Sequence, residues 1–163
     1  MPTLLVVVLA SFVITTFFGH AIHWALHQRW SGPFYRSHLD HHVLQYPPKN
    51  LTSTTYRLPS RGATGFVLFT PAFLVILGTA GGLLWMTGLP LWILAVLGPV
   101  MLGYGLFNDY VHDQFHIEGS WLNRFKWYKN LQVAHFIHHK NMKKNYGIVS
   151  LFWDRVFGTI KRP

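Results

Sequence analysis

The stretch TLLVVVLASFVITTFFGHAIHWALH, residues 3–27, decides the fold of this chain. It contains no Lys, Arg, Asp or Glu, and it is long enough to supply the ~20 apolar residues with which a helix crosses a membrane. His23 and His27 stand four residues apart at its end, so both imidazoles share one face of the last helical turn. The stretch therefore predicts a membrane-spanning helix that presents histidines at one surface of the bilayer.

The composition of the whole chain also favours a membrane protein. Half of the 163 residues are hydrophobic and only 12% are charged, about half the share that is usual in soluble domains. A cleavable signal peptide usually begins with a basic region, and residues 1–28 hold no Lys or Arg, so we expect the first helix to be retained. The length suits one domain, which we expect to cover residues 1–163. The absence of cysteine excludes disulfides and thiolate metal ligands.

Two further apolar runs, residues 62–87 and 90–111, predict a hairpin of membrane helices with a turn at Gly-Leu-Pro, residues 88–90. Pro71 and Pro99 lie inside these runs, where neighbouring helices can satisfy the carbonyls that a proline frees. The fold class that we expect is all-α. It is an integral membrane bundle of about three transmembrane helices with a cytoplasmic helical cap that carries a histidine-rich dimetal site.

The cap comes from the polar segments. Residues 34–44 predict a short helix, and residues 121–139 predict a helix in the membrane interface, with Trp121, Phe125, Tyr128 and Gln132 at helical spacing. The fourteen Lys and Arg residues all lie in 29–61 or 124–162, which the three expected spans deliver to one side. The positive-inside rule makes that side cytoplasmic, in an inner or plasma membrane. Three apolar spans would interrupt a basic nucleic-acid-binding surface, so we expect no nucleic acid partner.

Ten of the eleven histidines fall into four clusters, two spaced His-x-x-x-His and two spaced His-x-x-His-His. Either spacing gathers imidazoles on one helix face, and the expected topology brings all four clusters to the same side. Ten imidazoles suit two metal ions, and imidazole binds iron, zinc or copper. The candidate metal ligands are His23, His27, His38, His41, His42, His112, His116, His135, His138 and His139. We expect His20, the one outside the clusters, to be structural.

Carboxylates lie inside or beside these clusters as well. Only five are present in the chain, and Asp40, Asp109 and Asp113 stand among the histidines. A carboxylate that accepts the second ring N–H of a ligating histidine is a common arrangement. We expect Asp40 and Asp109 to play that part rather than to ligate a metal directly. Asp154 and Arg155 are expected to pair with each other or to cap a turn.

The four clusters, in this order around a membrane hairpin, resemble the fatty acid hydroxylase/sterol desaturase superfamily from about residue 20 to residue 160. GYGLFNDYVHDQFH (103–116) looks like the third histidine box of that family. YPPKNLTSTTYRLPS (46–60) and YGIVSLFWDRVFGT (146–159) are similar to segments of fatty acid 2-hydroxylases. Carotenoid β-ring hydroxylases are similar through HDQFH and AHFIHH (134–139), but they fit less well in the other two segments.

The chain also departs from the pattern of the hydroxylases. It has three clear spans where they usually have four, no fused cytochrome b5-like domain is expected, and Ala134 precedes His135 where many hydroxylases add another histidine. These differences leave the substrate open between a fatty acyl chain, a sterol and a carotenoid. Hydroxylation and desaturation also remain open, since both begin by abstracting a hydrogen atom.

The resemblance implies a membrane oxidoreductase with two metal ions, O2 as co-substrate and a lipid substrate. Iron is the preferred metal because O2 activation needs redox chemistry, which zinc lacks, although imidazole would hold zinc too. A separate electron donor, a ferredoxin or a cytochrome b5-like protein, is implied as a partner. A non-enzymatic membrane metal-binding protein is the alternative from another class. A transporter is disfavoured because its ligands would lie near the bilayer midplane.

Overall fold

The computed structural model describes residues 2–57 and 65–163, and the side chains of 4–57 and 70–163. No strand is present in these residues, so the all-α expectation is confirmed. The long helices are α1 (Pro2–Leu26), α3 (Gly65–Thr87) and α4 (Trp92–Phe115). The shorter elements are η1 (Arg29–Ser31), α2 (Pro33–Asp40), η2 (His41–Gln45), η3 (Trp121–Arg124), α5 (Lys126–Lys140) and α6 (Phe152–Val156). Arg61 and the expected start of the second span at residues 62–64 lie outside the described residues.

The long helices meet the requirements for crossing a membrane. Their candidate spans are Leu4–Leu26, Thr70–Thr87 and Trp92–Phe115, and no more than 17% of the residues in the apolar window of each are buried inside the protein. Their apolar side chains therefore face outward, as they do toward lipid and as they rarely do toward water. Helices α3 and α4 continue through Pro71 and Pro99. The expectation of three membrane-spanning helices is confirmed among the described residues.

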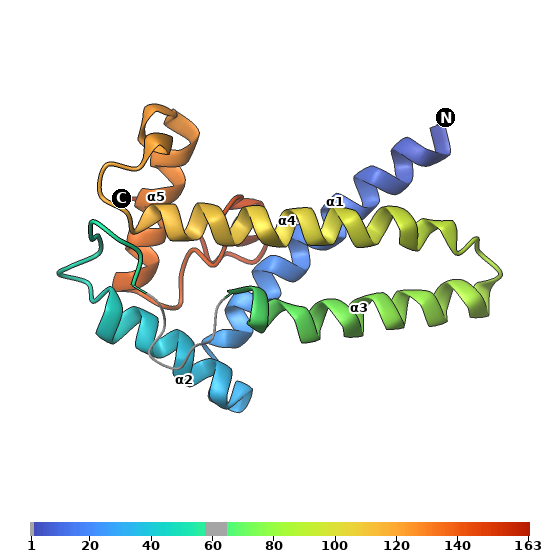
Figure 1. The fold of residues 1–163 in the computed structure, drawn as a ribbon, viewed down its shortest axis with the longest axis horizontal. Coiled ribbons are helices and arrows are strands. Elements are labelled where there is room, and N and C mark those ends of the chain that lie inside the picture. The colour runs from blue at the N-terminus through green and yellow to red at the C-terminus, as the bar shows by residue number, and fades with distance from the viewer. Residues whose placement is uncertain (1, 58–64) are drawn as a thin grey trace.

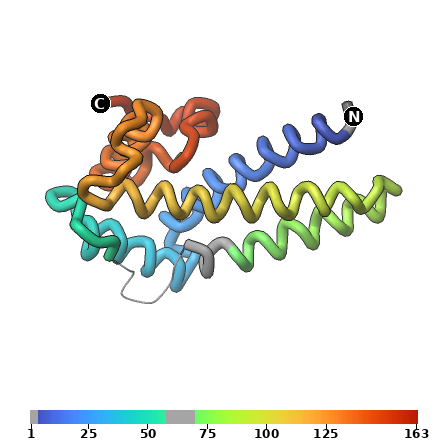
Figure 2. The backbone as a smooth tube through the Cα atoms, turned by 45° about the horizontal axis from the view of Figure 1, so that its top comes forward, coloured from blue at the N-terminus to red at the C-terminus, as the bar shows by residue number. Residues whose placement is uncertain are grey.

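The long helices bring the histidine-bearing ends together. Helix α1 packs along α4, and α4 packs against α3, its partner in an antiparallel hairpin. The N-terminus and the α3–α4 turn lie at one end of the molecule, whereas α2, α5 and the C-terminus lie at the other (Figures 1 and 2). Gly88 allows the turn, because its φ of +69° is left-handed. The last turns of α1 and α4 therefore both reach the end that carries the shorter helices.

The cap has a small hydrophobic core of its own. Val111 and Phe115, from the end of α4, are buried against Leu122, Tyr128 and Ile148. This core joins the membrane helices to α5 and to the C-terminal segment. Burial of such side chains stabilises the packing by about 1.5–3 kcal/mol each, so the cap is fixed firmly to the helix that brings His112 and His116.

Residues 121–139 correct one expectation. They form η3 and α5, separated at the extended Phe125, and they do not make one interfacial helix. Tyr128 is fully buried, and its hydroxyl donates to the Gln114 carbonyl at 2.6 Å. Gln132 donates to the Phe115 carbonyl at 2.9 Å. The last carbonyls of a helix have no partner within it, so Tyr128 and Gln132 cap the end of α4, whereas Trp121 of the same stripe is exposed.

Candidate metal centre

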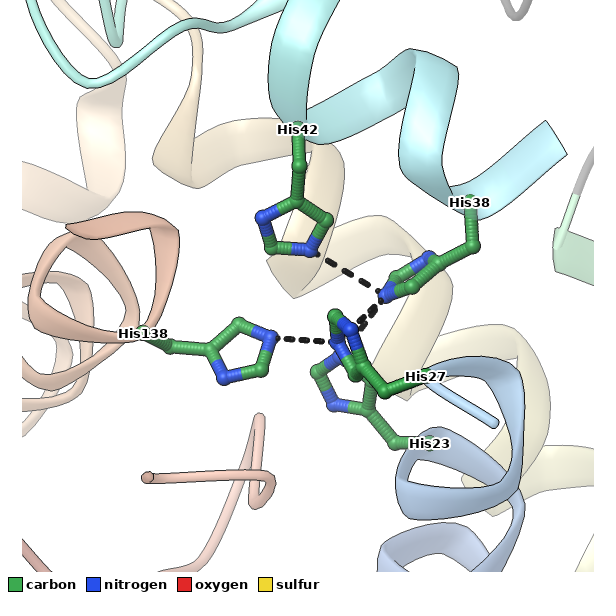
Figure 3. Close-up of side chains that lie close together, drawn as sticks. All are labelled: His23, His27, His38, His42 and His138. Atoms are coloured by element: carbon green, nitrogen blue, oxygen red, sulfur yellow. Dashed lines mark hydrogen bonds between the residues drawn. The ribbon is translucent and has the colours of Figure 1, made fainter. Parts of the chain in front are cut away.

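All ten clustered histidines meet at the junction of the membrane helices and the cap. Nine of them form two groups, and within each group the candidate ligand atoms lie within 4.8 Å of one another. The first group is His23, His27, His38, His42 and His138. Their imidazoles point toward one another from α1, the turn directly after it, α2, η2 and α5 (Figure 3). The second group is His41, His112, His116 and His135, and Nε2 of His139 lies 3.0 Å from Nε2 of His135.

The two groups explain why the chain contains two kinds of spacing. His23/His27 belongs to the first group, and His112/His116 belongs to the second. Each His-x-x-His-His cluster contributes to both groups. In one cluster His38 and His42 join the first group while His41 joins the second.

In the other cluster the assignment is reversed. His138 joins the first group, whereas His135 is in the second and contacts His139. Each group thus contains two pairs of histidines spaced i, i+4. It also contains one histidine, His138 or His41, from the His-x-x-His-His cluster that supplies a pair to the other group. The result is an approximate internal symmetry that relates the two groups.

Backbone carbonyls orient four of these rings. Nδ1 of His23 donates to the Tyr146 carbonyl, and Nδ1 of His138 donates to the Lys144 carbonyl at 2.6 Å. In the second group, Nδ1 of His116 bonds the Leu51 carbonyl at 2.7 Å and Nδ1 of His139 bonds the Tyr46 carbonyl at 2.9 Å. A carbonyl oxygen can only accept, so Nδ1 carries the proton and Nε2 of each neutral ring is left with a lone pair.

These lone pairs converge on short distances. Nε2 of His38 lies 3.0–3.1 Å from Nε2 of His23, His27 and His42. Nε2 of His135 lies 3.0 Å from Nε2 of both His116 and His139. A proton on Nε2 of His38 or His135 could be donated to only one of the neighbouring Nε2 atoms, and the lone pairs of the others would repel one another. A cation placed among them removes the repulsion, so the donor set fits a bound metal ion in each group.

Burial keeps the imidazoles neutral. It lowers the pKa of His27 to about 4 and the pKa of His139 to about 3. Burial first, and neighbouring imidazoles second, also hold the pKa of His38, His41, His42, His116, His135 and His138 well below the usual value. A metal ligand must be deprotonated, so these histidines are ready to ligate at neutral pH. Nε2 of His41 is buried without a hydrogen-bond partner among the described residues, as expected of a ligand atom.

The two carboxylates named from the sequence lie beside the histidines. Asp40 is the last residue of α2, and Asp109 stands one turn before His112 on α4; both are half-buried. Their role as acceptors for ligating histidines stays a prediction, as does ligation by the ten histidines. At the four rings described above, backbone carbonyls accept from the second ring nitrogen.

Asp154 is the carboxylate whose role in the site was missed. It is fully buried, and it accepts the backbone N–H groups of Tyr146 and Gly147 at 2.8 Å each and the Thr159 hydroxyl at 2.7 Å. The N–H of Gly147 and the carbonyl of Tyr146 belong to one peptide group, and that carbonyl accepts from His23. Burial alone would raise the pKa of Asp154, but these bonds and nearby His20 hold it below its usual range.

Asn145 completes this arrangement. It adopts a left-handed φ of +56°, is fully buried, and donates to the carbonyls of Ala134 and Lys161. The left-handed turn separates Lys144 from Tyr146, whose carbonyls orient two histidines of the first group. The sequence signal for this segment is the similarity of residues 146–159 to a segment of fatty acid 2-hydroxylases, which does not reveal the contacts.

His20 lies outside both groups. It is buried, its Nδ1 lies 3.7 Å from a carboxylate oxygen of Asp154, and its ring stacks on Phe157 at 5.4 Å. The structure thus places it in the packing of α1 against the C-terminal segment, in agreement with the structural role expected for it.

These features together define a membrane protein of three candidate spans, with a buried polyhistidine centre able to hold metal at the junction of its helices and cap. A family model described as fatty acid hydroxylase matches residues 8–159. The chain belongs to the fatty acid hydroxylase family.

One curated relative is a dihydroceramide fatty acyl 2-hydroxylase of Arabidopsis thaliana, with 37% identity over 67 residues. The matched stretch covers 40% of this chain and 27% of that protein, so the chain spans only about a quarter of its relative's length. No solved structure matches the chain. The match to the family model therefore shows the family, whereas ligation of metal by the histidines stays a prediction.

Proposed function

We propose that this protein is a membrane-bound non-haem dimetal oxygenase that hydroxylates an alkyl C–H bond in the fatty acyl chain of a lipid. The observation that carries the proposal is the pair of buried histidine groups at the ends of apolar helices, in a chain that belongs to the fatty acid hydroxylase family. The relative named above acts on a fatty acyl chain according to its name, which supports this substrate over a sterol or a carotenoid.

The chemistry that two bound redox metal ions supply is the activation of O2: R–H, O2, two electrons and two protons yield R–OH and one water. Iron suits this chemistry, because zinc has no redox states. The histidines of the first group would hold one ion, and those of the second group, with His139, would hold the other. The carbonyls of Tyr46, Leu51, Lys144 and Tyr146 keep four Nε2 atoms directed inward.

The location of the site suits a lipid substrate. The last turns of α1 and α4 bring His23 and His112 from the membrane spans themselves, so an alkyl chain in the bilayer could reach the centre without crossing water. Burial of the imidazoles also excludes bulk water from the centre. A reactive oxidant generated there would then meet the substrate before it meets solvent.

Electrons must come from a separate donor, and we propose an acidic ferredoxin or cytochrome b5-like protein. Exposed basic side chains, including Arg29, Lys49, Arg124, Lys126 and Lys143, lie in the segments at the histidine-bearing end. Such charges attract an acidic partner and speed its encounter. The same basic segments favour a cytoplasmic location for this end, in an inner or plasma membrane.

The first experiment measures the metal content of the purified, detergent-solubilised protein together with its lipid products. We expect about two ions per chain, because the structure has two histidine groups, and a hydroxylated acyl product when O2, iron and a reductant are supplied. His138→Ala should lose the ion of the first group and the product while it remains in the membrane fraction. Bound metal without product under these conditions would favour the metal-binding alternative, and full activity in His138→Ala would refute the site.

A further inference from the structure

A half-open pocket lies between α1, α3 and α4, directly below the histidines. Its empty space is about 400 Å³ and is continuous with the open surroundings of the helices. Phe73 and Ile76 line it from α3, Phe18 and Ile22 line it from α1, and Met101 lines it from α4. All three helices are candidate membrane spans, so the open side of this pocket faces the alkyl chains of bilayer lipids.

The lining of the pocket continues into the metal centre. On α1, Thr15 and Gly19 line the pocket and are four residues apart. His23, of the first histidine group, follows Gly19 at the same spacing. Residues spaced i, i+4 lie on one helix face, so the pocket and the first histidine group share a wall. A ligand in this pocket would therefore have one end at the centre.

The wall formed by α4 has the same property. Tyr104 and Asn108 line the pocket, and the next two residues of that row are His112 and His116. Asn108 stands one turn, about 6 Å along the axis, from His112. The second histidine group therefore shares this wall of the pocket.

Asn108 and Tyr104 are the polar side chains of the lining for which no hydrogen bond is found among the described residues. Asn108 is the more deeply buried of the two, with a side chain only 7% exposed, and it stands one turn nearer to the histidines. Thr15 also lines the pocket, but its hydroxyl is satisfied by the Ser11 carbonyl at 2.7 Å. An amide buried in a membrane helix without a partner costs free energy, which a ligand with a hydrogen-bonding group would recover.

We propose that this pocket binds the alkyl chain of the lipid substrate and that the amide of Asn108 binds the polar group at the head of that chain, a carbonyl or amide. This inference rests on the proposed function, because it takes the occupant to be the substrate. The alkyl chain of the lipid runs from Asn108 toward Thr15 and Met101, away from the histidines. The carbons beside the polar group therefore lie nearest the metal centre, so Asn108 directs oxidation to the first few carbons of the chain.

Photo-crosslinking tests the binding part of the proposal. Two probes are applied to the metal-loaded protein in nanodiscs: a long-chain N-alkyl amide with a diazirine in mid-chain, and a hydrocarbon of equal length with the same diazirine but no polar group. Labelled peptides are identified by mass spectrometry. We expect the amide probe to label Phe73, Ile76 or Met101 about tenfold more than the hydrocarbon does, the factor that one hydrogen bond of about 1.4 kcal/mol provides.

Asn108→Leu removes the amide while nearly preserving side-chain volume. It should abolish the preference for the amide probe, retain both metal ions, and spread the hydroxyl over more carbons of an acyl substrate. Leu102→Ala is the matched control, because Leu102 lies on the same helix, is 44% exposed and is not among the residues that line the pocket. This control should behave like the wild type with both probes.

The outcomes separate this proposal from the proposed function. Equal labelling by both probes in the wild type, as an ordinary structural lipid would give, overturns the proposal. So does labelling outside the pocket or an unchanged preference in Asn108→Leu. Pocket labelling that depends on Asn108, in a protein that forms no hydroxylated product, would support the pocket and refute the oxygenase.

Discussion

At the scale of single residues, neighbours in the sequence serve different halves of the centre. His41 and His42 are adjacent, yet His41 lies with the second group and His42 with the first. Their side chains diverge because adjacent residues on a helix point in different directions, whereas His38 and His42, four residues apart, share a face. Proximity in sequence is therefore a poor guide to which ion a histidine would hold.

This division predicts the behaviour of double variants. His41→Ala combined with His112→Ala removes ligands of the second group alone, so the protein should retain one of its two ions. His41→Ala combined with His42→Ala removes a ligand from each group and should weaken both ions. Elemental analysis after dialysis against a chelator measures the difference. Equal metal loss in the two double variants would contradict the assignment of the groups.

His20→Ala should retain both metal ions. The ring of His20 contacts Asp154 and Phe157 and belongs to neither group. Its removal should reduce thermal stability through lost packing, by roughly 1–3 kcal/mol for a buried side chain, without changing metal content. Elemental analysis and thermal unfolding measure the two effects separately, and a lost ion would place His20 among the ligands.

The lowered pKa values predict an effect of acid. The folded metal-free protein keeps His27 neutral down to about pH 4 and His139 neutral down to about pH 3, whereas the unfolded chain binds protons near pH 6.5. The unfolded state therefore holds more protons between these values, and stability rises with pH in that window. We expect the metal-free protein to lose stability as the pH falls from 6.5 to 4. Chemical unfolding of the metal-free protein in detergent measures the free energy of unfolding across this pH range. A free energy that does not change with pH would show that the histidines are exposed.

At the scale of elements, the C-terminal segment acts on the centre from outside it. Lys144 and Tyr146 offer carbonyls to His138 and His23, and Asp154 holds the Tyr146–Gly147 peptide in place. Gly147 is required at this point, because a Cβ there would lie 1.9 Å from the Ser150 carbonyl oxygen. This segment contains no candidate ligand, yet its fold determines the tautomers of two histidines in the first group.

Asp154→Asn should therefore weaken the first group in particular. An amide cannot accept from both backbone N–H groups as the carboxylate does, so the peptide that orients His23 would shift. Loss of such outer contacts typically costs 10–100-fold in metal affinity. We expect that range for one ion and little change for the other, measured by competitive chelator titration. Arg155→Gln, an exposed neighbour, is the control, and equal weakening of both ions would indicate a general loss of fold.

At the scale of the whole molecule, the three spans place the cap and the α3–α4 turn at opposite ends (Figure 1).

The chain has no cysteine, so single introduced cysteines can report on which side of the membrane each position lies. Leu89→Cys, in the turn, and Lys143→Cys, in the cap, are both exposed positions. In sealed vesicles an impermeant maleimide should label one of them and not the other. In intact cells, Lys143→Cys should be protected, because the basic cap is expected to face the cytoplasm. Labelling of both positions from the same side would refute the three-span topology.

The sequence by itself determined the spans, the helical class and the set of histidines that meet. Hydropathy and i, i+4 spacing are local properties, so they can be recognised in a stretch such as residues 3–27 without knowledge of the rest. Residues 121–139 show the limit of this reasoning. The spacing of Tyr128 and Gln132 indicated a helix face, but it could not say whether that face meets lipid or the end of α4.

Only the tertiary structure decided which histidine belongs to which group and which atom of each ring points inward. His23 is oriented by the carbonyl of Tyr146, 123 residues away, and His139 by the carbonyl of Tyr46, 93 residues away. Every residue carries the same backbone carbonyl, so no pattern of side chains shows which carbonyls will orient a histidine. The orientation of the imidazoles follows from packing between distant segments, which exists only once the chain has folded.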